Sequence, residues 1–382
     1  MKILVIGRAL PDRNKGSFGL FEFQQTVALG KYVDVSYLFV ENTPILSKYK
    51  KINKVVNGIP TIGRHVPLKG FFGLFNLFRS KMFISIYDEY MKLYGKPDIV
   101  HVHFPTIVLN DKIIDFFEKN RIKLVVTEHW SKVQNKELSK RKIKLLKRIS
   151  AFSEFVVCVS DQLKKSIDEL TENKTNTIVI PNMISDIFFK QKTNRSSIDN
   201  KFVFTYIGSF VRTKRIELLV SAFENEFLME DNIKLNIVGG GGKINSLKRM
   251  IKDKTLEKIN FTGAVSNKEV VNYLSYTSAY VSASKLETFG VPFVEALAMG
   301  IPIIAADNLP IAKYINHENG LLFKVDNQKD LQTQMRKIYV NKENYDSKMI
   351  AKNIYDIFSS DIIVKQLLEL YNEINNKKGK PI

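Results

Sequence analysis

The 382-residue chain is short of cysteine. Cys158 is its only one, and a single thiol excludes an internal disulfide. Apolar runs are short as well, and none reaches the roughly 18 residues that a membrane-spanning helix needs. The apolar start at 3–6 is too short for a signal peptide. We therefore expect a cytoplasmic protein, with Cys158 as a small core residue within the apolar run 155–159.

Two common phosphate-binding motifs are also missing. The first strand, loop and helix expected at 2–29 lack G-x-G-x-x-G, so they do not indicate a dinucleotide site. Four glycines at 239–242 precede a lysine, but Ile244 stands where a Walker A loop needs Ser or Thr to bind magnesium. Neither stretch predicts a nucleotide site of these two kinds.

Acidic residues are too few to balance the basic ones. The 58 Lys and Arg against 39 Asp and Glu give a formal net charge of +19. Such an excess indicates an anionic partner, namely nucleic acid, a membrane surface or a phosphorylated substrate. No recognised nucleic-acid motif occurs, so we do not expect nucleic acid, although a basic nucleic-acid-binding protein stays open as an alternative.

Short apolar strands alternate with helical segments, which predicts an α/β protein of two doubly wound domains. We place an N-terminal domain at 1–184, a polar linker at 185–200, a second domain at 201–360 and a closing helix within 361–382. Strands are expected at 2–6, 33–40, 98–103, 123–129, 155–160, 177–182, 202–207, 234–238, 279–283 and 301–305. Helices are expected at 21–29, 161–170, 216–223, 270–274 and 361–374.

Two basic segments in the first half each allow two interpretations. Residues 69–87 carry apolar side chains at helical spacing together with Lys69, Arg79 and Lys81. A core helix explains them most simply, and a basic amphipathic helix that touches lipid is the alternative. Residues 132–149 are predicted to form one strongly basic helix, which is either a solvated face or a surface for an acidic membrane or phosphorylated carrier lipid.

Two histidines end neighbouring strands of the first half. His103 closes the D-I-V-H-V-H run, in which the two histidines share a face, and His129 closes K-L-V-V-T-E-H. Ligands of open α/β sheets sit at the carboxyl ends of strands, so both side chains lie at ligand height. A metal site needs a third ligand that the sequence does not supply.

The most informative stretch is 282–305, S-A-S-K-L-E-T-F-G-V-P-F-V-E-A-L-A-M-G-I-P-I-I-A. We expect Glu287 on a loop and Glu295 in the first turn of a helix at 293–299. The free N–H groups of a helix N-terminus attract a phosphate, and carboxylates beside it are tolerable where sugar hydroxyls donate to them. A nucleotide sugar offers both groups. The alternative is a capped helix with Glu295 near its dipole and Glu287 solvated.

This stretch resembles the E-x7-E signature of retaining glycosyltransferases of family 4, through S-x-x-E-x-F-G and E-A-x-A-x-G-x-P-x-x-A. The resemblance implies the GT-B fold, in which two Rossmann-like domains face each other across a cleft. It also implies transfer of a sugar from a nucleoside diphosphate to an acceptor hydroxyl with retention of configuration. The leaving phosphate then helps to deprotonate the acceptor.

The resemblance also assigns roles to residues. Glu287 would bind the sugar hydroxyls, His129 would orient the sugar, and Lys214 would neutralise the diphosphate. Glu295 would bind the ribose. The remaining donor-site candidates are Gly208, Ser209, Arg212, Arg215, Gly263, Ala264 and the backbone of Phe289, Gly290 and Val291. Gly16, Gly19 and His103 form a weaker group near the phosphates or the acceptor, and a plain turn is an equal explanation for the two glycines.

One position departs from the family pattern. Ser209 stands where the family has Arg after the glycine, while Lys214 matches, and Arg212 or Arg215 is available to compensate. An inactive glycosyltransferase-like scaffold therefore stays open, as does a sugar-nucleotide epimerase with the same fold.

The resemblance further implies partners and place. We expect no cofactor and no metal, because Lys214 replaces the ion and no Asp-x-Asp motif occurs. The donor would be a nucleotide sugar, with UDP favoured over GDP, and the acceptor a sugar or lipid-linked saccharide. Bacterial surface polysaccharide or glycolipid synthesis on the inner face of the membrane would suit the basic first half.

Overall fold

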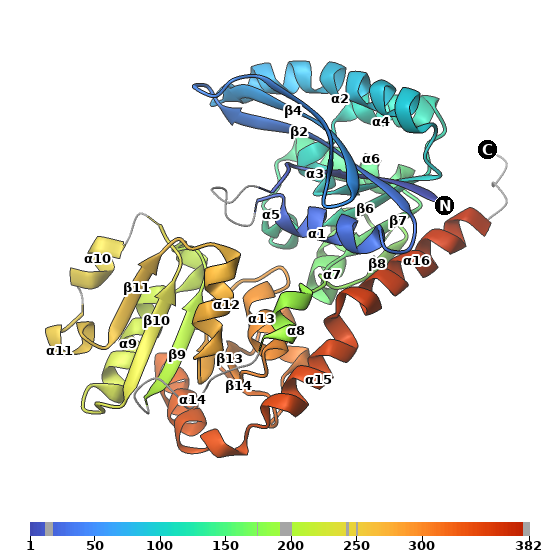
Figure 1. Ribbon diagram of the computed structural model, residues 1–382. Helices are drawn as coiled ribbons and strands as arrows, with labels where there is room; N and C mark the ends of the chain where they lie inside the picture. Colours follow the sequence, from blue (N-terminus) through green and yellow to red (C-terminus); the bar gives the residue numbers. More distant parts are fainter. Residues whose placement is uncertain (12–17, 174, 192–200, 242–243, 250, 377–382) are drawn as a thin grey trace. The chain divides into compact units, whose positions relative to one another are not determined.

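The computed structural model describes residues 1–11, 18–173, 175–191, 201–241, 244–249 and 251–376. These form two compact units, and Figure 1 traces the chain through both. The first comprises Met1–Pro181 together with Ile363–Ile382, and the second is Asn182–Ile362. Each unit is built on its own sheet, so the predicted pair of α/β domains is confirmed.

The first unit holds an eight-stranded sheet in the order β3-β4-β2-β1-β5-β6-β7-β8. All neighbours pair in parallel except β3, which is antiparallel to β4 at one edge. Strands β1, β5 and β6 are almost completely buried, as expected where helices cover both faces of a parallel sheet. The strands are β1 Lys2–Gly7, β2 Asp34–Pro44, β3 Lys50–Val56, β4 Ile59–Lys69, β5 Ile99–His103, β6 Leu124–Glu128, β7 Phe155–Cys158 and β8 Thr177–Val179.

Helices connect these strands. Side chains cap several of them, since Asn110, Ser139 and Ser160 each accept a hydrogen bond from a backbone N–H of the first turn. Cys158 is fully buried, which raises the pKa of its thiol and confirms it as a core residue. The helices are α1 Leu20–Leu29, α2 Phe72–Tyr94, α3 Pro105–Val108, α4 Asp111–Lys119, α5 Ser131–Gln134, α6 Lys140–Phe152 and α7 Asp161–Leu170.

The second unit holds a six-stranded, fully parallel sheet in the order β11-β10-β9-β12-β13-β14. Its strands are β9 Phe202–Ile207, β10 Ile233–Val238, β11 Ile259–Gly263, β12 Ala279–Val281, β13 Ile303–Ala306 and β14 Gly320–Phe323. Its helices are α8 Asp186–Lys190, α9 Ile216–Phe227, α10 Ile244–Arg249, α11 Asp253–Leu256, α12 Asn267–Ser275, α13 Val291–Ala298, α14 Gln328–Val340 and α15 Ser347–Phe358, with short 3-10 turns η2 Arg212–Lys214, η3 Pro310–Tyr314 and η4 Lys342–Asn344.

Two sequence-based expectations about segments of the chain are wrong, and one hairpin was missed. The basic segment 132–149 is not one helix, because the backbone of Lys136 adopts the left-handed conformation and separates α5 from α6. The linker 185–200 contains α8, whose Phe188 is buried, and 192–200 lie outside the described residues. The β3–β4 hairpin was not predicted, because its outer strand is mostly exposed and carries little apolar alternation.

Helix α2 is a core helix along part of its length, and its contact with lipid stays a prediction. Its C-terminal part packs on β2 and β4, and Phe83, Ile86 and Tyr90 are buried there (Figure 1). Its first turns instead expose large apolar side chains to solvent. No helix among the described residues combines the length and apolar character needed to cross a membrane.

The last helix, α16 Ser360–Asn376, begins in the second unit and packs mainly on the first. Tyr371 places its hydroxyl 2.5 Å from Nδ1 of His101, and the opposite ring nitrogen of His101 lies 2.6 Å from Thr127 Oγ1. Leu367 is fully buried. The C-terminal segment is therefore part of the core of the first unit.

We predict that Leu367→Ala lowers the unfolding free energy of the first unit by about 2–5 kcal/mol, because it leaves a cavity in a packed apolar site. Urea denaturation followed by fluorescence measures the loss. Glu369→Ala, on the exposed face of the same helix, serves as the control and should change stability by less than about 0.5 kcal/mol. Equal effects of the two substitutions would contradict the packing of α16 described above.

Candidate active site

The strand order of the second unit creates a site at one sheet edge. The chain leaves β9 toward β10 on one side, while β12 pairs with β9 on the other, so the connections diverge between β9 and β12. Ligands of open α/β sheets bind at the carboxyl ends of strands at such a point. The loops that follow β9 and β12 carry Lys214 and Glu287.

Glycines allow three backbones to converge at this edge. A Cβ on Gly239 would come within 1.9 Å of the carbonyl oxygen of Gly208, and a Cβ on Gly208 would come within 2.5 Å of the hydroxyl of Tyr206. Gly239 also donates its N–H to the carbonyl of Gly263, whose φ of +72° favours glycine. Gly240 lies against the backbone of Ala264. The predicted donor residues Gly208, Gly263 and Ala264 therefore lie together.

An ion pair joins the two loops. Nζ of Lys214 contacts Oε1 of Glu287, and both side chains are largely covered, at 19% and 13% exposure. The backbone supports this contact, because Lys285 N donates to the carbonyl of Thr213 at 2.9 Å. A carboxylate has several acceptor positions, so Glu287 keeps capacity for sugar hydroxyls while it holds Lys214.

Helix α13 begins beside Glu287. Gly290 precedes it with φ +96°, and Pro292 occupies its first turn. Within the described part of the chain, the backbone N–H groups of Phe289, Gly290 and Val291 donate to no acceptor. Such N–H groups at a helix N-terminus form a ready site for a phosphate.

Glu295 is not in the first helical turn, which corrects the sequence-based placement. The helix starts at Val291, two residues earlier than expected, because Pro292 is accommodated inside its first turn. Glu295 is half-buried, and burial raises the pKa of its carboxyl to about 8. Burial raises the pKa of Tyr280, and the charges of Tyr206, Glu287 and Glu295 raise it further.

The two arginines available to compensate for Ser209 differ. Ser209 itself is exposed. Arg215 has left-handed backbone at the start of α9 and forms an ion pair with Asp326. Arg212 is exposed, and no carboxylate of the described residues pairs with it. Of these two arginines, Arg212 is therefore the one whose charge no described carboxylate already neutralises.

The first unit brings its two predicted histidines together. Nδ1 of His103 lies 3.0 Å from Nε2 of His129, and their rings stack. His103 is buried, and burial, followed by the charges of His129 and Arg8, lowers its pKa. His101 stacks on the other side of His103, which confirms that the two histidines of the strand share a face. Nε2 of His103 has no partner among the described residues.

Sequence reasoning missed the residue that fixes His129. Glu128 is buried and accepts hydrogen bonds from the backbone N–H groups of His129 (2.8 Å) and Trp130 (2.9 Å) and from the hydroxyl of Thr106 (2.7 Å). Burial raises its pKa, while these three donors favour the charged form. A carboxylate at the end of the apolar run K-L-V-V-T-E was the available signal.

Arg8 was missed as well. It follows β1, forms an ion pair with buried Glu22 at 2.8 Å, and lies over the ring of Phe104 at 3.4 Å. Gly19 lies nearby in the chain, with φ +78° and no room for a Cβ against the carbonyl of Ala9. Gly16 falls outside the described residues. A cation directly after the first strand was the signal for Arg8.

We predict that Glu295 makes stability fall as pH rises. Its folded pKa of about 8 exceeds the ordinary value of 4.5, so between these values the folded protein holds a proton that the unfolded chain releases. Between about pH 5 and about pH 8, the unfolding free energy of wild type should fall by about 2 kcal/mol relative to that of Glu295→Gln. The expected loss is smaller than for a fully buried carboxyl, because Glu295 is half-buried.

Urea denaturation of both proteins at each pH measures this difference. Glu217→Gln, which removes an exposed carboxylate of α9, is the control and should show no such trend. A constant gap between wild type and Glu295→Gln at all pH values would contradict a protonated Glu295.

Comparisons with known proteins agree with this geometry. The family model for Glycosyltransferase Family 4 matches residues 33–186, and the model for Glycosyl transferases group 1 matches residues 188–355. The two models together match most of the chain.

Characterised relatives extend over similar lengths. The N-acetyl-alpha-D-glucosaminyl L-malate synthase of Bacillus anthracis is 25% identical, over 74% of this chain and 77% of its own. The alpha-monoglucosyldiacylglycerol synthase of Acholeplasma laidlawii is 27% identical, over 88% and 90%. The capsular polysaccharide biosynthesis glycosyltransferase CapM of Staphylococcus aureus is 23% identical, over 84% and 87%.

Solved structures show the same architecture. Sucrose-phosphate synthase from Thermosynechococcus elongatus superposes with a TM-score of 0.77 at 18% identity, and covers 98% of both chains. Anabaena Alr3699/HepE superposes with a TM-score of 0.73 at 16% identity, over 98% of this chain and 100% of its own. With its family models, its relatives and its fold in agreement, this chain belongs to glycosyltransferase family 4 and is a glycosyltransferase with the GT-B fold.

Proposed function

We propose that this glycosyltransferase moves a sugar from a nucleoside diphosphate to an acceptor hydroxyl with retention of configuration. The observation that carries the proposal is the Lys214–Glu287 ion pair together with the backbone N–H groups of residues 289–291. Among the described residues, these N–H groups donate to no acceptor. Together they offer a cation and backbone donors for a diphosphate, and a carboxylate for sugar hydroxyls, within one site.

The electrostatics of the site suit this donor. The diphosphate binds the free N–H groups before α13 and the ammonium of Lys214, which is neutralised by Glu287 until the donor arrives. Arg212 adds the exposed cation that the family pattern expects from the position of Ser209. Glu287 then accepts hydrogen bonds from the sugar hydroxyls.

Glu295 and the strand ends bind the nucleoside. A carboxyl with a pKa of about 8 is protonated near neutral pH, and it both donates to and accepts from ribose hydroxyls. We assign the contacts to the base to the backbone of Gly263 and Ala264. Structures of HepE contain UDP and UDP-glucose, which supports a uridine nucleotide here as well.

The transfer step needs no protein nucleophile. The bond from C1 of the sugar to the phosphate oxygen breaks, and its electron pair stays on the diphosphate. The acceptor oxygen bonds to C1 on the same face and gives its proton to the leaving phosphate. Lys214 and the backbone N–H groups stabilise the charge that develops on this phosphate, so the proposed reaction uses neither a cofactor nor a metal ion. His129, fixed by Glu128 and His103, orients the sugar.

The acceptor follows from the relatives and the charge of the chain. One relative is named a monoglucosyldiacylglycerol synthase and another a capsular polysaccharide glycosyltransferase. We assign this chain a saccharide or lipid-linked saccharide acceptor in bacterial surface polysaccharide or glycolipid synthesis. It would work in the cytoplasm, peripherally attached to the anionic inner face of the membrane.

Titration calorimetry with UDP, GDP and ADP tests the donor site. We expect UDP to bind and Glu295→Ala to weaken it about tenfold, because the substitution removes hydrogen bonds to the ribose. GDP and ADP should bind more weakly. If none of the three nucleotides binds wild type, the donor-site assignment is wrong.

Steady-state kinetics test Lys214. Lys214→Gln should reduce kcat by about 10²–10³-fold, because the ammonium acts on charge that develops in the transition state. Lys252→Gln, an exposed lysine elsewhere in the second unit, is the matched control and should leave kcat unchanged. A Lys214→Gln enzyme that retains full kcat would exclude the proposed role.

A further inference from the structure

A pocket in the first unit lies outside the residues assigned to sugar transfer. Its volume is about 520 Å³, and helices α2, α4 and α6 with their connections surround it. Four of its lining side chains are cations, against a single carboxylate. The charged residues that line it are Arg79, Lys112, Arg141, Lys142 and Asp111.

The two cations deepest in this pocket are held by neutral groups. Arg79 donates to the carbonyls of Ile107 and Leu109, and Lys142 donates to the carbonyl of Thr106. Nε of Arg79 is buried and has no acceptor among the described residues. Burial lowers the pKa of Arg79 to about 10, and burial with the charges of Arg79 and Arg141 lowers that of Lys142. The charges of Arg79 and Arg141 repel Lys142, and the carboxylate of Glu128 offsets only part of this effect.

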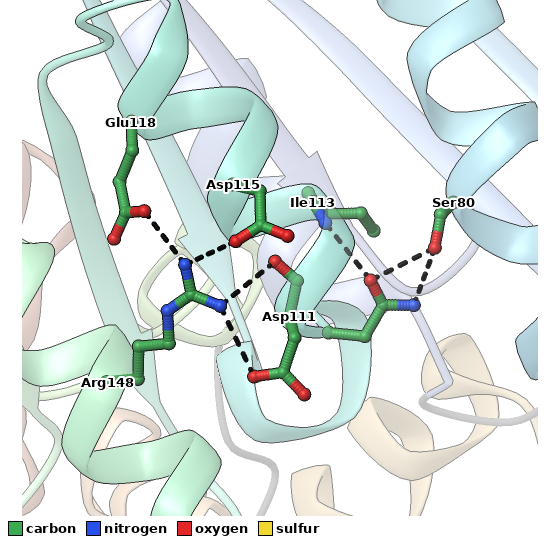
Figure 2. A network of polar contacts seen from close by, with 7 residues as sticks. Ser80, Asp111, Ile113, Asp115, Glu118 and Arg148 are labelled. Carbon is green, nitrogen blue, oxygen red and sulfur yellow. Dashed lines mark hydrogen bonds and ion pairs between the residues drawn. The ribbon is translucent and has the colours of Figure 1, made fainter.

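The nearby acidic side chains are already engaged. Figure 2 shows Arg148 of α6 reaching the carboxylates of Asp111, Asp115 and Glu118 on α4. Its Nη2 lies 2.5 Å from Asp115 and 2.8 Å from Glu118. In the part of the chain that the structure describes, none of the four pocket cations forms an ion pair. The acids of α4 neutralise Arg148 and leave the pocket positive.

The N-termini of two helices add to the positive electrostatic potential of the pocket. Asn110 caps α4 and Ser139 caps α6, and both residues line the pocket. Asn110 accepts a hydrogen bond from the backbone N–H of Ile113 and donates one to the hydroxyl of Ser80. The positive ends of both helix dipoles therefore lie at the pocket wall. Ser80, Asn76 and Ser139 supply neutral hydrogen-bonding groups.

An apolar ridge adjoins the pocket. It consists of Phe71, Leu74, Leu77 and Phe78, which are 58%, 43%, 61% and 40% exposed. Their spacing places them on one side of the start of α2, and Leu77 also lines the pocket. Large apolar side chains beside cations are the pattern of a surface that enters the interface of an anionic membrane.

We propose that this pocket binds the phosphate group of an anionic phospholipid while the apolar ridge enters the membrane interface. The inference rests on the membrane attachment within the proposed function and names the site that produces it. The positive charge of the pocket is complementary to a phosphate group. The adjoining apolar ridge favours a lipid over a soluble phosphate compound. The pocket belongs to the first unit, whereas the donor-site residues Lys214, Glu287 and Glu295 belong to the second.

Vesicle co-sedimentation tests the charged part of this site. Wild type should bind phosphatidylcholine vesicles that contain phosphatidylglycerol and ignore pure phosphatidylcholine. The double variant Lys112→Glu/Arg141→Glu, whose two side chains are exposed and unpaired, should lose about tenfold or more in affinity. The matched control Lys92→Glu/Lys96→Glu makes the same charge change beyond the pocket, around the C-terminal end of α2, and should bind as wild type does.

A second pair of variants separates lipid from free phosphate. Leu77→Ser/Phe78→Ser should weaken vesicle binding but leave binding of inorganic phosphate, measured by calorimetry, unchanged. Equal vesicle binding by wild type and Lys112→Glu/Arg141→Glu would overturn the assignment of the pocket as the phosphate-binding site. Binding of inorganic phosphate without binding of vesicles would overturn the lipid assignment. UDP titration of each variant shows whether the donor site is intact, so failure here is distinguishable from failure of the proposed function.

Discussion

The ion pair between Lys214 and Glu287 is the contact on which the proposed donor site depends. It joins the loop after β9 to the loop after β12, at the point where the connections of the sheet diverge. Both groups are largely covered, so removing either one leaves a charge with poor access to water. The pair therefore holds the two loops in place before any donor binds, and it positions Glu287 at the start of α13.

The rest of this site is shaped by the absence of side chains. Gly239 approaches the backbone of Gly208 too closely to carry a Cβ, and Gly290 precedes α13 with positive φ. The groups proposed to bind a diphosphate are consequently backbone N–H groups and one ammonium, whose positions the sheet and helix fix. Few side chains therefore have to move when a donor binds. Such a fixed site suits the proposed reaction, which needs stabilisation of the charge on the leaving phosphate and no protein nucleophile.

Sequence patterns predicted those features that depend on neighbours along the chain. The bounds of α7 and β9 and the loop position of Glu287 followed from strand and turn signals. Glu295 was misplaced by one turn because a proline was taken to end the loop, whereas Pro292 sits inside the helix. The contacts of Arg148 with α4, and of His103 with His129, join residues far apart in sequence and carry no local signal.

Charge in the basic segment 132–149 shows why composition alone was ambiguous. Among its cations, three form ion pairs and two others line a pocket. Lys136, Lys147 and Arg148 form ion pairs with acids of neighbouring helices and turns, as a solvated face would. Arg141 and Lys142 instead line a pocket in which the cations outnumber the one carboxylate, Asp111, and neither of them forms an ion pair among the described residues. The pairing of each side chain, and not the net charge, decides which cations are available to an anionic partner.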